Sequence, residues 1–61
     1  MKNEQLRETL RWLQMQIDHA SDVIKESRVN QNFGREAQYE GMREAYTQVL
    51  KWISNAEANP A

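Results

Sequence analysis

The sequence predicts an all-α protein, an antiparallel two-helix hairpin that assembles into a homo-oligomeric helical bundle. Apolar residues recur with heptad spacing in two long segments. Glycine and proline, which punctuate turns and strands, number only two and one. The chain has 61 residues and no cysteine, so it cannot use the disulfides that stabilise many small domains. A partner chain is the remaining means of stabilising so small a core.

The whole chain, residues 1–61, is predicted to form one domain with helices over residues 3–29 and 35–56. In the first helix, steps of four and three residues separate the seam positions Leu6, Leu10, Leu13, Ile17, Ala20, Ile24 and Ser27. The second helix has a similar seam at Tyr39, Met42, Tyr46, Val49, Ile53 and Ala56. Such seams are typical of helices that pack against each other.

A loop is predicted over residues 30–34, where asparagine and glycine suit a helix end and a turn. Asn32 is expected to cap the second helix, and Phe33 to fold over the end of the bundle near Val29. So short a loop makes the two helices antiparallel. The last residues, 57–61, lose the periodicity, and we expect them to fray.

Large apolar side chains also flank both seams. A helix in a hairpin has only one neighbour, so these flanks would face water in a monomer. Exposed apolar patches usually mark interfaces. The residues predicted to form the interface between chains are Trp12, Val23, Leu50 and Trp52.

The charge pattern excludes several classes of partner. Eight basic and nine acidic residues give a net charge of −1, unlike the basic footprint of a protein that binds duplex nucleic acid. No apolar run is long enough for a transmembrane helix or a signal peptide. The sequence therefore predicts a cytoplasmic protein without membrane contact, in the host cytoplasm if a phage encodes it.

Metal, cofactor and enzyme signatures are also missing from the sequence. A single histidine and no cysteine argue against a zinc site. Glu36, Glu40 and Glu44 form an acidic stripe that we expect to face solvent, because the chain has no Glu-x-x-His pair. His19, between Asp18 and Asp22, is expected to hydrogen-bond across an interface, since a hairpin offers little concavity for catalysis. We expect no metal, no cofactor and no enzymatic activity.

One set of residues combines charge with aromatic rings, as a site for a nucleotide-like anion requires. This candidate ligand site, expected where chains meet, consists of Arg43, Tyr39, Tyr46, His19, Gln16 and Trp12. The alternatives are that the tyrosines belong to the core and that Arg43 pairs with Asp22 of another chain. Gly41 lies within the second predicted helix, where glycine lowers helix stability by about 1 kcal/mol relative to alanine. A glycine at such a position indicates that another helix or a ligand approaches closely.

The stretch from Tyr39 to Ile53, with its Y-E-G-M-x-x-A-Y-x-x-V-L pattern, resembles the second helix of short phage and prophage proteins from Gram-positive bacteria. Some small phage proteins of this build are anti-defence factors, including oligomeric sponges that sequester nucleotide-derived immune signals. The resemblance implies a role of that kind. It maps no ligand residue of that family onto this chain.

The function expected from the sequence is therefore that of a non-enzymatic, oligomeric binding protein. The first hypothesis is a phage-type inhibitor that sequesters a nucleotide-derived immune signal between subunits. The alternatives are a protein–protein interaction module and a purely structural dimer.

Overall fold

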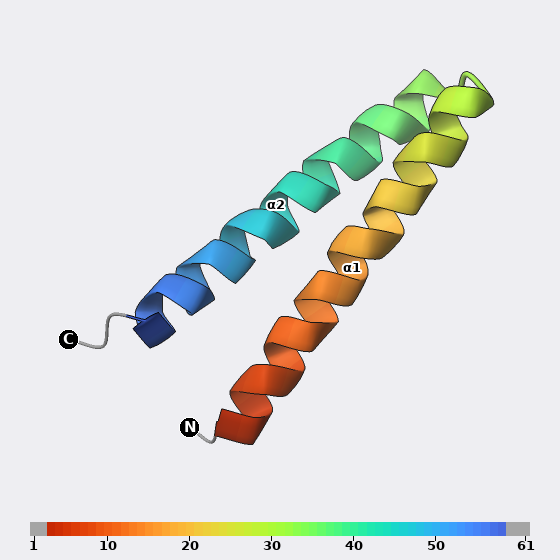
Figure 1. Ribbon diagram of the computed structural model, residues 1–61. Coiled ribbons are helices and arrows are strands. Elements are labelled where there is room, and N and C mark those ends of the chain that lie inside the picture. The colour runs from red at the N-terminus through yellow and green to blue at the C-terminus, as the bar shows by residue number, and fades with distance from the viewer. Residues whose placement is uncertain (1–2, 59–61) are drawn as a thin grey trace.

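The computed structural model describes the backbone of residues 3–58 and the side chains of residues 3–56. This part of the chain forms two helices, α1 (Asn3–Val29) and α2 (Phe33–Ala58). They pack side by side as an antiparallel hairpin, with the two chain ends at the end opposite the turn (Figure 1). The Cα atoms span 45 × 19 × 12 Å, so the hairpin is long and thin. The predicted all-helical hairpin is confirmed.

The predicted bounds hold for α1 and differ for α2. The second helix begins at residue 33, two residues before the predicted start, because the Asn32 side chain caps it. The Asn32 Oδ1 accepts a hydrogen bond from the Arg35 backbone N–H at 3.2 Å. The helix continues to residue 58, so residues 57–58 of the predicted frayed tail are helical. Residues 59–61 of that tail lie outside the described residues.

The turn is a Schellman motif that ends α1. The Asn32 N–H donates to the Ser27 carbonyl at 2.7 Å, and the Gln31 N–H donates to the Arg28 carbonyl at 3.1 Å. This geometry requires a left-handed residue, and Gln31 adopts it with a φ of 57°. Asparagine and glycine were the expected turn formers, but Gly34 lies in the first turn of α2.

Phe33 does not cover the end of the bundle as predicted. Its exposed fraction is 66%, and that of Val29 is 81%. The cap at Asn32 makes Phe33 the first residue of α2 and leaves its side chain in solvent.

The core is supplied almost entirely by α1. Its fully buried residues are Leu13, Ala20, Val23, Ile24 and Ser27. Four of these five belong to the predicted seam, which is confirmed for this helix. Val23 is the exception, because it was predicted to flank the seam and to form an interface between chains. It is 5% exposed within one chain, so that prediction is wrong.

The contact face of α2 is rotated from the predicted seam. No described residue of α2 is fully buried; its half-buried residues are Glu36, Tyr39, Met42, Arg43, Tyr46, Thr47, Leu50 and Ile53. Val49 is 39% exposed, whereas the neighbouring Leu50 is half-buried. Apolar residues at adjacent positions left the rotation of α2 undetermined by periodicity. Leu50, predicted as an interface residue, instead faces inward.

Burial is concentrated toward the turn. Every fully buried residue lies between Leu13 and Ser27, and the two helices diverge toward the chain ends (Figure 1). Near the open end, the seam residues Leu6, Leu10 and Ile53 are only half-buried. Within residues 3–58, neither helix is long and apolar enough to cross a membrane.

We expect Gln31→Gly to raise the free energy of unfolding by about 1 kcal/mol. A left-handed conformation strains any residue with a side chain, and glycine removes the strain. The opposite sign is expected for Gln14→Gly at an exposed position within α1, which should cost about 1 kcal/mol. Urea unfolding followed by circular dichroism measures both variants. A Gln31→Gly variant less stable than the wild type would contradict this assignment of the turn.

Ser27→Ala is also expected to stabilise the hairpin, by about 1 kcal/mol, because leaving a polar group buried without a partner is costly. Ser27 is 2% exposed, and its Oγ has no hydrogen-bond partner among the described residues. The matched control is Ser54→Ala, at an exposed position of α2, which should change stability by less than about 0.5 kcal/mol. If Ser27→Ala loses stability in thermal unfolding, the hydroxyl has a role that its surroundings do not show.

Candidate functional site

Aromatic side chains from both helices meet along one edge of the hairpin. Trp12 and Tyr46 form an edge-to-face pair with ring centroids 5.8 Å apart and planes at 87°. About two helical turns nearer the loop, His19 and Tyr39 form a similar pair, with ring centroids 6.3 Å apart and planes at 73°. Gln16 is half-buried on α1, between the two aromatic residues of that helix in sequence. We call these five residues the aromatic edge.

A cation from outside the predicted ligand set joins this edge. The Arg35 guanidinium carbon lies 5.8 Å from the centroid of the Tyr39 ring, within the range of a cation–π interaction. The sequence carries the signal, because residues four apart in a helix are surface neighbours.

Arg43, the favoured candidate for binding an anion, lies on the opposite edge. Its Nη1 donates to Ser21 Oγ at 3.3 Å. Ser21 and Trp12 are nine residues apart, about half a turn around α1, so they point to opposite sides. The structure therefore brings together five of the six predicted ligand residues and separates Arg43 from them. Within one chain, Arg43 bridges the helices.

The same edge as Arg43 carries an ion-pair cluster near the turn. Arg28 Nε lies 2.5 Å from Glu36 Oε2, and Arg28 Nη2 lies 3.3 Å from Glu40 Oε2. The hydrogen bond to Glu36, followed by the negative charge of that carboxylate, raises the pKa of Arg28 above its ordinary value. Two members of the predicted solvent-facing acidic stripe thus bind α1, and the Glu36 side chain is only 15% exposed. For Glu36 the solvent prediction is wrong.

Large apolar side chains remain in solvent around the aromatic edge and the open end. The exposed fractions are 51% for Trp12, 59% for Met15 and 65% for Trp52. Trp12 and Trp52 were predicted as interface residues, and both have the free surface that such a role requires. Asp18 and Asp22, the neighbours of His19, are exposed, and Asp18 accepts a hydrogen bond from Gln14 at 3.1 Å.

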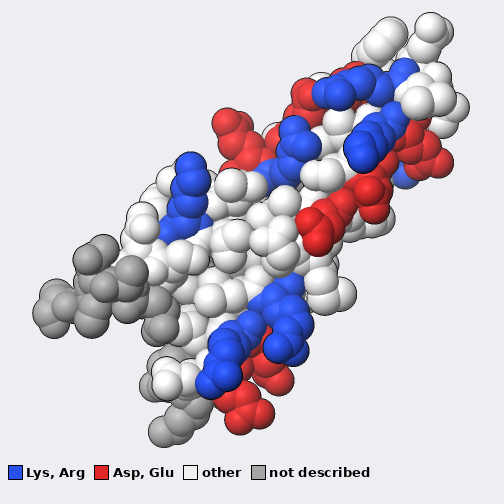
Figure 2. All heavy atoms as spheres, viewed as in Figure 1, with Lys and Arg blue, Asp and Glu red and all other residues white. Residues whose placement is uncertain are grey.

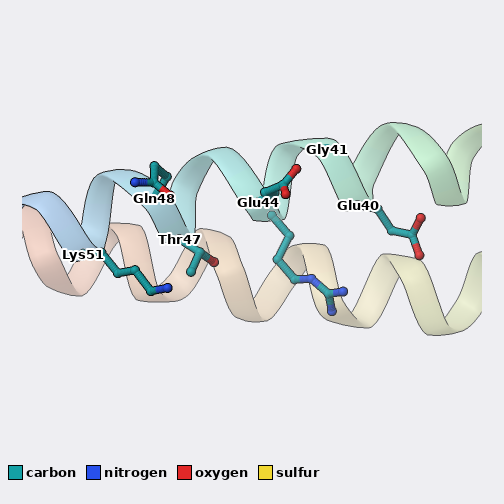
Figure 3. Close-up of a pocket in the computed structure, with 7 residues that line it drawn as sticks. Glu40, Gly41, Glu44, Thr47, Gln48 and Lys51 are labelled. Atoms are coloured by element: carbon teal, nitrogen blue, oxygen red, sulfur yellow. The ribbon is translucent and has the colours of Figure 1, made fainter.

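The surface depressions of the described residues are not enclosed sites. Each of three is lined by one helix only: one on α2 between Glu40 and Lys51, and two on α1 between Glu4 and Trp12. In the depression on α2 the side chains are strung along the helix and do not converge on a common point (Figure 3). Among the described residues, no group of three or more acidic or histidine side chains is placed to hold a metal ion.

Charged side chains are unevenly distributed over the surface. Figure 2 shows most of them gathered around the turn end and at the start of α1, with an isolated basic side chain farther along α2 and uncharged side chains over the middle of this view. The ion-pair cluster at Arg28 accounts for part of the group at the turn. An uncharged middle is suited to contact with another molecule, since no ionised group there would have to lose its water.

The chain matches no protein-family model, no curated protein and no solved structure.

Proposed function

We propose that this protein is a non-enzymatic interaction module that works as a homo-oligomer, most simply a two-fold symmetric dimer. The observation that carries the proposal is the amount of surface that one chain leaves in water. Its accessible area is 4871 Å², whereas a compact monomer of its 7.2 kDa mass would expose roughly 4,100 Å². The excess is close to the area, about 800 Å² per partner, that a typical stable interface covers.

The shape and composition of the surface support the same proposal. The radius of gyration is 14.1 Å, against roughly 10.5 Å for a compact domain of this length. The exposed residues Trp12, Met15 and Trp52 are of the kinds enriched at interfaces. A second hairpin would complete a four-helix bundle, in which each helix has two neighbours.

A second candidate function is sequestration of a nucleotide-derived signal, as a phage-type inhibitor acting in the host cytoplasm. The observation that favours it is the grouping of the Arg35 guanidinium with the Tyr39 and His19 rings. A cation beside aromatic rings suits a phosphate and a base. Because one hairpin has no enclosed site, a second chain would have to close the pocket.

Self-association predicts that sedimentation velocity between about 1 and 100 µM will give a species of twice the chain mass. Thermal unfolding should shift upward with concentration, as mass action requires. Trp52→Ser should weaken association, because it removes an exposed apolar side chain from the open end. Phe33→Ser, with a similar exposed fraction at the turn end, is the matched control. A folded monomer throughout this range, with concentration-independent unfolding, would falsify the proposal.

The nucleotide candidate predicts that ADP-ribose or a cyclic dinucleotide raises the unfolding temperature of the wild type. Arg35→Ala should then weaken binding by about tenfold or more, whereas Arg43→Ala should leave it unchanged, because only Arg35 lies at the aromatic edge. Isothermal titration calorimetry separates the two variants. No shift with any of these nucleotides rules this candidate out, and equal losses in both variants place the anion elsewhere.

A further inference from the structure

The side of α2 turned away from the ion pairs carries a continuous uncharged stripe. Its positions follow helical spacing along the length of the helix, and we call it the outer stripe: Gln38, Gly41, Met42, Ala45, Gln48, Val49, Trp52 and Ala56. All of these residues are exposed except Met42, which is half-buried. The charged residues among the described side chains of α2 lie off the stripe: Arg35, Glu36, Glu40, Arg43, Glu44 and Lys51.

Gly41, near the middle of this stripe, has no structural reason within its own chain. A Cβ built on it would meet no atom within 4 Å, and its φ is not positive. Alanine would therefore fit in the isolated hairpin and would favour the helix. A glycine in such a place is explained by another backbone or a large side chain that approaches from outside the chain.

We propose that the outer stripe is the contact between two copies of α2, which cross antiparallel at a two-fold axis beside Ala45. This inference rests on the self-association proposed above and assigns its surface. Under this symmetry Ala45 faces its own copy, and Val49 lies opposite the partner's Gly41. Trp52 lies opposite the partner's Gln38, whose side-chain oxygen is a suitable acceptor for the indole N–H. Each contact occurs twice, as a self-complementary interface requires.

Three features favour a second copy of the chain as the occupant. An axis at Ala45 lies at the middle of α2, Phe33–Ala58, so the two helices overlap along their full length. In this register Ala45 faces its own copy, so the two backbones can approach closely. The small Gly41 faces the larger Val49, so the space between the helices is filled. The seam also buries no ionised group, so it carries no charge-desolvation cost.

The outer stripe faces away from α1. Ala45 lies five residues before Leu50, which faces inward, and five residues turn a helix by about 140°. With a partner on the stripe, α2 would have a neighbour on each side, α1 and the partner's α2.

Cysteine cross-linking tests the axis directly, because the chain has no cysteine of its own. In an Ala45→Cys variant the two thiols would lie across the axis, within the range of about 7 Å between Cα atoms that a disulfide spans. Mild oxidation should convert it to a covalent dimer at least about tenfold faster than the matched Ser54→Cys variant, whose exposed residue lies nine residues farther along, about half a turn around α2 from Ala45. Non-reducing electrophoresis gives the rates.

A charge-insertion pair supplies a second readout. Ala45→Arg should raise the dimer dissociation constant by about a hundredfold, since it buries an unpaired charge, whereas Ser54→Arg, at an exposed position off the stripe, should leave it within about twofold. Arginine is a good helix former, so the hairpin itself should persist. If the wild type sediments as a dimer but Ala45→Cys cross-links no faster than its control, the outer-stripe inference is overturned and self-association stands. A wild type that stays monomeric overturns both the proposed self-association and the outer-stripe contact; the outer stripe would then be a surface for a different protein.

Discussion

The structure depends on one constraint: each helix of the hairpin has only one neighbour. A helix of this kind can bury a single stripe of its surface, whatever the rest of its sequence offers. Here α1 buries five residues completely, and no described residue of α2 is fully buried. The hairpin therefore has a narrow core near the turn and a large apolar surface around it, which is the physical basis of the proposed association.

The two edges of the contact between α1 and α2 are lined by different kinds of side chain. On one edge, Arg28 and Arg43 of opposite helices reach across to Glu36 and Ser21. These partly buried polar bridges fix the register of the two helices. On the other edge the aromatic pairs, Trp12 with Tyr46 above all, bury apolar area in one chain and still expose much of it. This asymmetry directs any further packing toward the aromatic edge and the adjoining outer stripe of α2.

The same geometry bears on what kind of chemistry the protein can perform. A binding site that excludes water needs walls from several directions, and the depressions described here each have walls from one helix. A hairpin of this form gains concavity only when a second molecule supplies the missing side. For that reason the proposed functions, whether recognition of a protein or of a nucleotide, both begin with assembly.

The amino-acid pattern alone is enough to predict the fold of the chain and the position of its turn. Heptad spacing over residues 3–29 is strong enough to specify a helix and its buried face, and Asn32 is a good cap in any context. The sequence could not determine how α2 is rotated, because Val49 and Leu50, and likewise Trp52 and Ile53, offer apolar side chains on adjacent faces. The periodic pattern is satisfied equally well whichever residue of such a pair faces α1.

The packing of α2 against α1 selects which member of each pair faces inward. That rotation turned Arg43 toward Ser21 and away from the aromatic edge, and it left Arg35 beside Tyr39. It also buried Val23 and exposed Val49. The grouping of side chains at a site between helices depends on the angle of each helix about its own axis. That angle is set by the packing of both helices together, so no pattern within one helix contains it.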